Sequence, residues 1–170
     1  MRPALSQRPS APEIDIQVAS PLWQAKPDAE RTVREAIAAA AAMLSTAGGE
    51  VSIVLTDDEA IRALNREWRG IDKPTNVLSF PASKTGESRL LGDIVIAYET
   101  LRREGDDEDR DFLHHLAHLA VHGFLHLSGY NHETDEQAEA MEGIESKIMT
   151  RLNMPDPWLG RDLDRNFGDA

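Results

Sequence analysis

The sequence predicts a single α+β domain, with a roughly four-stranded mixed sheet, helices packed on that sheet and one central helix. Short segments that alternate apolar and polar residues are interleaved with longer segments that carry apolar residues at helical spacing. One helical segment, residues 111–127, is apolar nearly all round, which is typical of a helix in the interior. The length of 170 residues suits one domain with a sizeable core.

The first third of the chain predicts a strand, a helix and a second strand. Residues 13–19 alternate isoleucine and valine with polar residues, as a half-buried strand does. A proline and an aspartate at 27–28 then open a helix with an apolar stripe, and the glycine pair at 48–49 stops it. Residues 51–55 alternate again and form the second strand.

The middle of the chain predicts one helix and two strands. Thr56 and Glu59 have the spacing of a capping box, in which two side chains satisfy free backbone donors at a helix start. Gly70 ends this helix, which is expected to turn three side chains inward: Ile61, Leu64 and Trp68. Residues 76–80 form a short strand, and the nearly all-apolar residues 90–98 form a strand covered on both faces.

Two helices complete the predicted fold. The interior helix over residues 111–127 follows an acidic segment. Thr134 and Gln137 then form a second capping box. The helix that this box opens is expected to bury four side chains: Met141, Ile144, Ile148 and Leu152.

The composition limits the chemistry that the chain can perform. Cysteine is absent, which excludes disulfides, thiolate metal ligands and cysteine nucleophiles and suits a reducing cytoplasm. No apolar run reaches the length of a membrane span, and the N-terminus lacks the apolar segment of a secretory signal, so we expect a cytoplasmic protein without membrane contact. The net charge of −12 repels nucleic acid on average, so any contact with RNA needs a local basic patch.

Three histidines at the end of the interior helix form a candidate metal site. His122 and His126 are four residues apart, so both imidazoles lie on one face of the helix. Gly129 ends the helix, because glycine takes a left-handed cap without steric penalty, and the reversed chain can bring His132 back toward the other two. Three protein ligands leave a fourth position for water, as in catalytic zinc sites. We therefore expect one Zn²⁺ per chain and a metal-binding role for the central helix.

Other interpretations of these histidines remain open. Histidines on an apolar helix can be core residues satisfied by hydrogen bonds, although several of them are costly to bury without partners. His118 continues the series at steps of four and could replace His132 as a ligand. Each step turns about 40°, so His118 and His126 diverge by about 80° around the helix. We expect His118 to support or pack against the site, and His114 and His115 to lie at the surface.

A metzincin protease has a similar outline, and its general base is a glutamate directly after the first histidine. Gly123 occupies that position here, so a peptide hydrolase would lack its base.

The sequence predicts three segments. Residues 13–155 form a metal-dependent hydrolase domain, preceded by a flexible N-terminal arm (1–12) and followed by a polar C-terminal tail (156–170).

A row of arginines forms a second candidate site. Arg62, Arg66 and Arg69 follow one helical face, and the planar guanidinium group suits phosphate oxygens. Asp58 lies four residues before Arg62, so Arg62 and Arg66 also fit a solvated face, whereas Arg69 lies at the helix exit. Asp93 is a carboxylate within an apolar strand, and it either accepts a hydrogen bond from a metal-bound histidine or bonds locally.

The stretch His-Gly-Phe-Leu-His-Leu-Ser-Gly-Tyr-Asn-His, residues 122–132, resembles the signature His-Gly-x-Leu-His-Leu-x-Gly-Tyr-Asp-His of the YbeY family of bacterial endoribonucleases. Residues 64–81 are similar to the family's arginine-containing segment, and residues 91–94 to its last strand. The resemblance spans roughly residues 50–155. Asn131 stands where the family pattern has Asp, and an amide cannot act as a carboxylate base.

The resemblance implies a zinc-dependent, single-strand-specific endoribonuclease that acts in 3′-end maturation of small-subunit ribosomal RNA and in ribosome quality control. It implies that His122, His126 and His132 bind the metal and that Arg69 is the catalytic arginine. The implied partners are single-stranded ribosomal RNA and the ribosome or small-subunit proteins. The residues also leave open a zinc-dependent peptide or amide hydrolase, and a non-catalytic ribosome-assembly factor with a structural zinc. They fix neither the oligomeric state nor the general base, although Glu133 lies next to a ligand.

Overall fold

The structure is a computed structural model that describes residues 11–83 and 89–159. One mixed sheet contains four strands in the order β1-β2-β4-β3: β1 (Glu13–Val18), β2 (Glu50–Thr56), β4 (Leu90–Ala97) and β3 (Val77–Pro81). β1, β2 and β4 run parallel, and β3 is antiparallel to β4 at the edge. The helical elements are a 3-10 helix (Pro21–Ala25), α1 (Ala29–Met43), α2 (Asp58–Arg69), α3 (Tyr98–Asp107), α4 (Phe112–Leu127) and α5 (Asp135–Arg151). The predicted α+β class with a four-stranded mixed sheet is confirmed.

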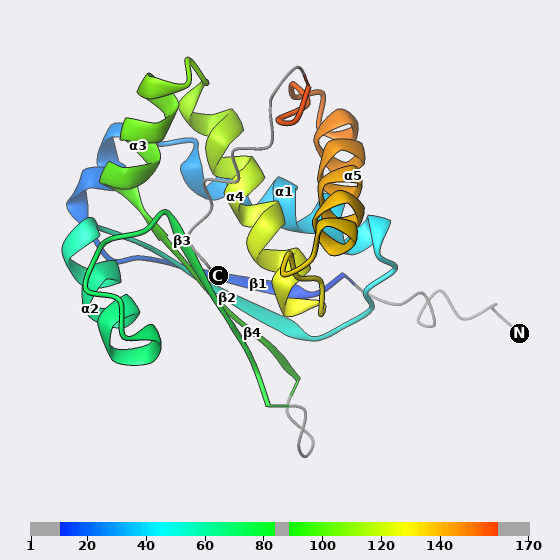
Figure 1. Ribbon diagram of the computed structural model, residues 1–170, viewed down its shortest axis with the longest axis horizontal. Coiled ribbons are helices and arrows are strands. Elements are labelled where there is room, and N and C mark those ends of the chain that lie inside the picture. Colours follow the sequence, from blue (N-terminus) through cyan, green and yellow to red (C-terminus); the bar gives the residue numbers. More distant parts are fainter. Residues whose placement is uncertain (1–10, 84–88, 160–170) are drawn as a thin grey trace, which may run out of the picture.

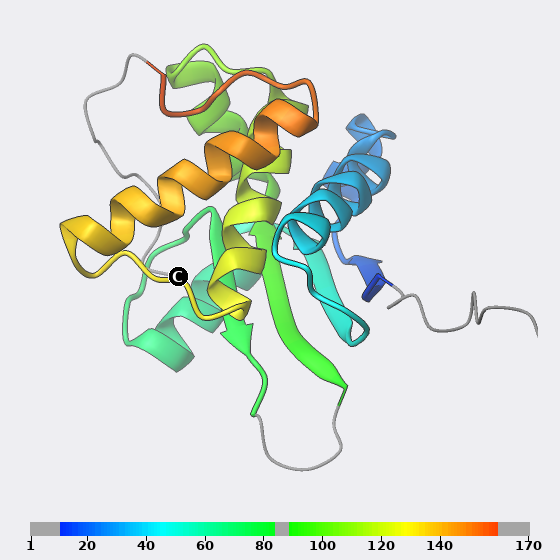
Figure 2. The same ribbon diagram turned by 90° about the vertical axis from the view of Figure 1, so that its right-hand side faces the viewer.

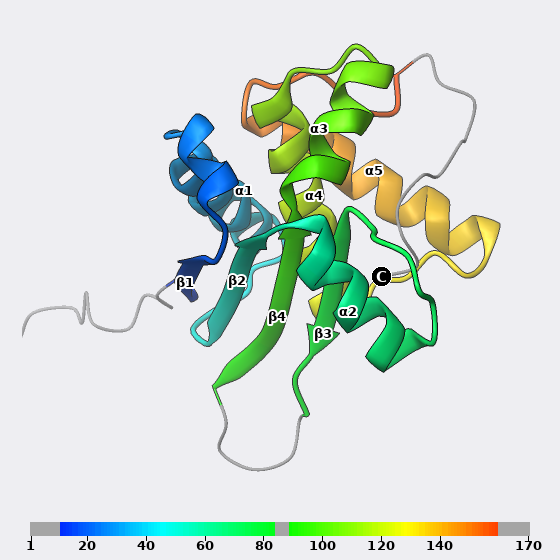
Figure 3. The same ribbon diagram turned by 90° about the vertical axis from the view of Figure 1, so that its left-hand side faces the viewer.

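The helices cover the two faces of the sheet unequally. α1, α4 and α5 lie on one side of the sheet, whereas α2 lies on the other (Figure 1, Figure 3). α4 packs on β3 and β4 and also contacts α1, α3 and α5, so it is the central helix that the sequence predicts (Figure 2). The larger hydrophobic core lies around α4, and a smaller one lies under α2: Ile61, Leu78, Val95 and Ala97.

Helix α4 is buried almost all round, as its sequence predicts. Twelve of its sixteen residues are buried. Asp111 caps its start by accepting hydrogen bonds from the N–H groups of Leu113 and His114. Gly123 faces the sheet, where an added Cβ atom would lie only 2.9 Å from Cγ2 of Ile94. The absence of a side chain at this position therefore lets α4 approach β4 closely.

Helix α2 differs from its prediction at both ends. Asp57 is the N-cap, because its side chain accepts a hydrogen bond from the N–H of Ala60 at 2.9 Å, so the predicted Thr56–Glu59 capping box is wrong. Trp68 is also not buried, contrary to the prediction: its exposed fraction is 65%, while that of Ile61 is 0%. Burial decreases along the inner stripe of α2 toward its C-terminus, which leaves the last aromatic ring in solvent.

Helix α3 is not among the elements that the sequence pattern predicts. It starts at Tyr98, which therefore belongs to the helix and not to the preceding strand. Its first turn is held by α2: Asp58 accepts a hydrogen bond from the N–H of Thr100 at 3.1 Å, and Glu99 accepts one from the N–H of Asp58 at 2.8 Å. The two helices cap each other across about forty residues. The sequence around residue 98 therefore contains no local capping pattern that predicts the start of α3.

The ends of the chain lie mostly outside the described residues. This applies to residues 1–10 of the expected N-terminal arm and to residues 160–170 of the expected tail. Within the described part of the tail, Pro157 is buried and Trp158 is half-buried. None of the helices found in residues 11–83 and 89–159 is both long and apolar enough to cross a membrane.

We expect the substitution Gly92→Ala to lower the free energy of unfolding by about 2–4 kcal/mol. Gly92 has φ +150°, and an added Cβ atom would lie 2.5 Å from both Cδ2 of Leu127 and the carbonyl oxygen of Phe80. Urea unfolding measures the effect. Gly143→Ala in α5 is the control, because that position is open and helical, and it should gain up to about 1 kcal/mol. Equal urea midpoints for Gly92→Ala and the unsubstituted protein would show that β4 yields at this point.

Candidate metal centre

Three imidazole rings converge at the C-terminal end of α4. His122 and His126 lie one helical turn apart on α4, and their Nε2 atoms are 3.0 Å apart. His132 comes from the loop that follows, with ring centroids 5.6 Å from His122 and 5.0 Å from His126. Their potential ligand atoms all lie within 4.8 Å of one another, so this is a group that could hold a metal ion.

The chain reversal that delivers His132 depends on a short turn after α4. Gly129 has φ +100°, a conformation that glycine adopts without penalty. The N–H of Tyr130 then donates to the carbonyl of Leu125 at 3.0 Å, which folds the chain back over the last turn of the helix. The expected glycine stop and chain reversal are therefore present, and they place His132 beside the two helical histidines.

Hydrogen bonds fix which nitrogen of each helical ring faces the centre. Nδ1 of His126 lies 2.9 Å from the backbone carbonyl oxygen of Tyr130, and Nδ1 of His122 lies 3.1 Å from a carboxylate oxygen of Glu145. A carbonyl and an ionised carboxylate only accept, so both rings donate from Nδ1 and direct Nε2, which carries a lone pair in a neutral ring, inward. Two such lone pairs at 3.0 Å repel each other unless a proton or a cation lies between them.

The third ring supplies an independent sign that a metal fits. Nε2 of His132 is buried and has no hydrogen-bond partner among the described residues. A space of about 10 Å³, roughly the room of one water molecule, lies beside His122 and His132. The pKa of His126 is lowered to about 4, first by burial and then by the charges of its two neighbours. Near neutral pH this ring is therefore unprotonated, which is the state that binds a metal.

Glu145 of α5 is the supporting residue that the sequence interpretation missed. Its carboxylate is 1% exposed and accepts hydrogen bonds from Nδ1 of His122, Nε2 of His118 and Nε1 of Trp158. Burial alone would raise the pKa of Glu145, but the attraction of His118 and the hydrogen bonds from both histidines outweigh it and hold the pKa well below its usual range. A signal was present: Glu145 occupies the buried stripe of α5, between Met141 and Ile148.

Asp93 does not take the supporting role toward a metal-bound histidine. Successive strand residues point to opposite faces, and Ile94 faces α4, so Asp93 points to the α2 side of the sheet. The structure gives it no hydrogen bond to a histidine among the described residues. His118 supports the centre through Glu145, as expected from its position on the helix.

The expectation that His115 lies at the surface is wrong. His115 is 3% exposed, and its Nε2 lies 2.9 Å from a carboxylate oxygen of Glu104 in α3. His114 is half-buried. The histidines at the start of α4 thus pack within the fold and lie away from the metal centre.

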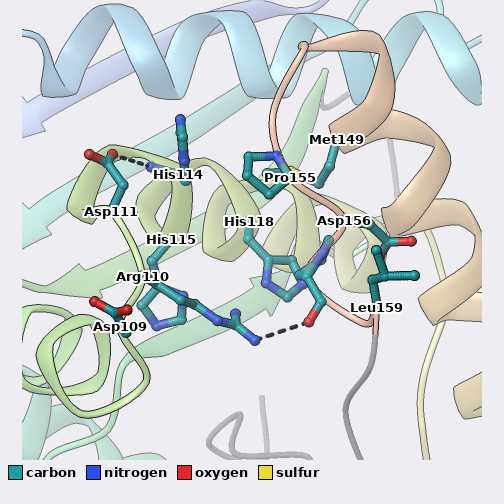
Figure 4. Close-up of a pocket in the computed structure, with 11 residues that line it drawn as sticks. Asp109, Arg110, Asp111, His114, His115, His118, Met149, Pro155, Asp156 and Leu159 are labelled. Carbon is teal, nitrogen blue, oxygen red and sulfur yellow. Dashed lines mark hydrogen bonds between the residues drawn. The ribbon is translucent and has the colours of Figure 1, made fainter.

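A larger cavity opens at the other end of α4. Its volume is about 380 Å³, and Figure 4 shows it between the start of α4 and the C-terminal segment. Arg110 closes one side by donating to the carbonyl of Pro157 at 3.0 Å. None of the three converging histidines lines this cavity, and it borders the metal centre only through His118.

The arginines of α2 lie across the sheet from the histidines. Arg62 forms two hydrogen bonds to Asp72, at 2.8 and 3.2 Å, which raise the pKa of Arg62. Its partner is thus Asp72, since Asp58 pairs with Arg103 instead. Arg66 is exposed, and Arg69 is half-buried in the last turn of the helix. The structure therefore brings the three histidines together but places Arg69 on a separate element.

The fold and the site together define a class of α+β proteins with three histidines that could hold a metal ion at the end of a buried helix. A family profile described as "Endoribonuclease YbeY" matches residues 16–153. The chain belongs to this YbeY endoribonuclease family. The match begins within β1 and includes α1. It therefore starts earlier in the chain than the resemblance seen in the sequence, which begins near residue 50.

Individual relatives agree with the family assignment. A Bradyrhizobium diazoefficiens protein named "Endoribonuclease YbeY" is 53% identical over 162 residues, covering 90% of this chain and 88% of the relative. A protein of the same name from Rhodopseudomonas palustris strain BisA53 is 53% identical over 159 residues, covering 89% of this chain and 92% of the relative. The solution structure of a Thermotoga maritima protein matches 88% of this chain and 99% of its own, with a TM-score of 0.56 and 22% identity, which shows a shared fold.

We expect Glu145→Gln to weaken metal binding by about 10- to 100-fold. The amide presents one acceptor oxygen to N–H donors that now meet two, so His122 is no longer held in one orientation. Competition between the full-length protein and a chromophoric chelator for Zn²⁺ or Co²⁺ measures the change. Glu139→Gln, at an exposed position of the same helix, should bind like the unsubstituted protein. An unchanged affinity in Glu145→Gln would mean that this carboxylate does not orient the ligand.

Proposed function

We propose that this protein is a zinc-dependent endoribonuclease that cleaves single-stranded RNA, with the ion held by His122, His126 and His132. The observation that carries the proposal is the convergence of the Nε2 atoms of His122 and His126 on a third, buried Nε2 that lacks a partner among the described residues. A nitrogen-only ligand set suits zinc, and the chain has no cysteine to offer a thiolate. The family name supplies the substrate class.

Each residue then has a defined task. His132 closes the third corner of the site, and the group found among the described residues has three members, which leaves a position for water or substrate. Bound zinc would supply a Lewis acid and lower the pKa of a water molecule. Glu145 keeps the Nε2 of His122 directed at the centre. Arg69 stabilises negative charge that develops on the phosphoryl oxygens.

No described carboxylate is assigned as general base. Glu133 and Asn131 are both exposed, and neither side chain forms a hydrogen bond with a described residue. Asn131 therefore does not orient a ligand histidine, although it stands where the family pattern has Asp. Its substitution leaves the three histidines in place.

A peptide hydrolase is disfavoured by the position after the first ligand. Gly123 lies against the sheet, with Ile94 only 2.9 Å from where its Cβ would be. A glutamate at this point would clash with the sheet and could not reach a water molecule at the metal. A purely structural zinc would need a fourth protein ligand, which the three-membered group among the described residues does not supply.

The cellular role follows from the family resemblance. We assign the protein to 3′-end maturation of small-subunit ribosomal RNA and to ribosome quality control in the cytoplasm, with the ribosome or its small-subunit proteins as partners. Residues 13–155 form the hydrolase domain in this proposal, with residues 1–12 and 156–170 as the arm and the tail. A protein of net charge −12 gains its RNA contacts from local arginines such as Arg69.

The decisive experiment compares the unsubstituted protein with His126→Ala and Arg69→Ala. Native mass spectrometry measures bound zinc, and gel electrophoresis measures cleavage of a short ribosomal RNA strand, both alone and paired with its complement. We expect His126→Ala to lose zinc and cleavage. Arg69→Ala should keep zinc and lose about 10²–10³-fold in kcat, the usual cost of removing one charge-stabilising group. Only the unpaired strand should be cut.

Two control variants make these outcomes specific. His114→Ala removes a histidine of α4 outside the centre and should retain zinc. Arg62→Ala removes an arginine of α2 that is already paired with Asp72 and should cleave normally. If His126→Ala retains zinc, His126 is not a ligand of the ion. If the zinc-loaded protein cuts no RNA, the assignment as a nuclease would have to be replaced by that of a ribosome-assembly factor.

A further inference from the structure

Trp68 is an exposed aromatic residue with one side already supported. Five large apolar side chains of the described residues are exposed, and Trp68 is the only aromatic one among them: Val18, Leu22, Trp68, Leu90 and Leu159. Its ring meets Phe80 of β3 edge to face, with centroids 6.1 Å apart and an interplanar angle of 61°. Phe80 therefore supports the indole, and the exposed fraction of 65% leaves ring surface in solvent.

The surroundings of Trp68 are basic in an acidic protein. Residues 60–75 contain three arginines and one lysine against one glutamate and one aspartate, a local charge of +2 where the chain totals −12. Arg69 follows Trp68 directly, about 100° further round α2. Arg66 is exposed and forms no hydrogen bond or salt bridge with a described residue. This part of the surface is therefore complementary to a polyanion.

The edge strand connects this surface to the metal centre. Ser79 of β3 donates to the carbonyl of Gly123, next to His122, at 3.3 Å. The adjacent residue, Phe80, points to the other face of the sheet and contacts Trp68. Because β3 is the edge of the sheet, no further strand of the described residues lies beyond it to separate the Trp68 side from the side of the metal centre.

We propose that Trp68 is a stacking platform for a base of single-stranded RNA. Arg66 and Arg69 lie on another face of α2, about 200° and 100° round the helix from Trp68, and contribute positive charge that attracts the strand. This inference rests on the proposed function and names where the substrate lies. Every base offers a π face, so the platform tolerates many sequences, whereas duplex bases are already stacked on each other. The platform thus also provides a physical source of single-strand preference.

The test is a thermodynamic cycle in which the Trp68 side chain and single bases of the RNA are removed separately and together, and the affinities are compared. Fluorescence anisotropy follows a labelled ten-nucleotide oligoadenylate, and a series of strands carries one abasic site at each position in turn. All proteins carry His126→Ala so that the strand is not cut. Trp68→Ala should bind the intact strand about 5- to 150-fold more weakly, the range for loss of one base–aromatic stack. Trp68→Phe should recover most of the affinity.

The abasic series identifies the base concerned. At one position, the abasic site should weaken binding to the protein that retains Trp68. On that same strand, the Trp68→Ala protein should bind as tightly as the protein that retains Trp68. Leu159→Ala, which removes another exposed apolar side chain, should not alter binding. Arg66→Gln should reduce the slope of log affinity against log salt by about 0.7.

The outcomes separate this inference from the proposed function. If Trp68→Ala binds every strand as tightly as the parent, while the zinc-loaded native sequence cleaves RNA, Trp68 is not a platform and the nuclease assignment stands. The indole would then be free for a protein partner. If the zinc-loaded native sequence fails to cleave RNA, the proposed function itself fails. Equal losses for Trp68→Ala and Trp68→Phe would point to a disturbed fold and would also overturn the stacking role.

Discussion

The geometry of the metal centre depends on one buried carboxylate. Glu145 receives N–H groups from α4 and from the C-terminal segment: those of His118, His122 and Trp158. An ionised carboxylate inside a protein costs several kcal/mol unless such donors replace its water. Here the donors come from elements that must all be in place. The carboxylate therefore joins α5, α4 and the segment that carries Trp158 to one another and orients the ring of His122 at the same time.

The position of α4 depends in turn on two glycines at the sheet. Gly92 and Gly123 occupy points where a Cβ atom would come within 3 Å of a neighbour. Close packing of this kind leaves few alternative positions for a helix. The positions of His122 and His126 are therefore also fixed, because the helix backbone and their Nδ1 hydrogen bonds hold them. Only His132 lies on a loop, and the turn at Gly129 determines where it falls.

The elements that follow local rules could be predicted from the sequence. Alternating apolar residues locate β1 and β2, and the Thr134–Gln137 capping box locates the start of α5. The four-residue spacing of His122 and His126 is enough to place both on one helical face. These predictions succeed because a helix turn and a strand repeat are set by neighbouring residues alone.

The features that were missed depend on contacts between distant segments. The start of α3 is held by Asp58 of α2, and the support of His122 comes from Glu145, which lies 23 residues away. Trp68 follows the inner stripe of α2 and contacts Phe80 of the sheet, yet its side chain stays 65% exposed. Two signals were available, however. Asp93 alternates with the inward-facing Ile94, and Glu145 interrupts an apolar stripe.

The support of His122 also sets the order in which the centre is completed during synthesis. A growing chain contains all three histidines once residue 132 has been made, but Glu145 and the indole N–H of Trp158 that binds it are made later. Until then the carboxylate lacks one of its donors, and α5 is not tied to the segment that carries Trp158. The nascent protein can therefore carry all three histidines without their finished geometry. In a nuclease family, the finished geometry of the three histidines is thereby postponed until residue 158 has been made.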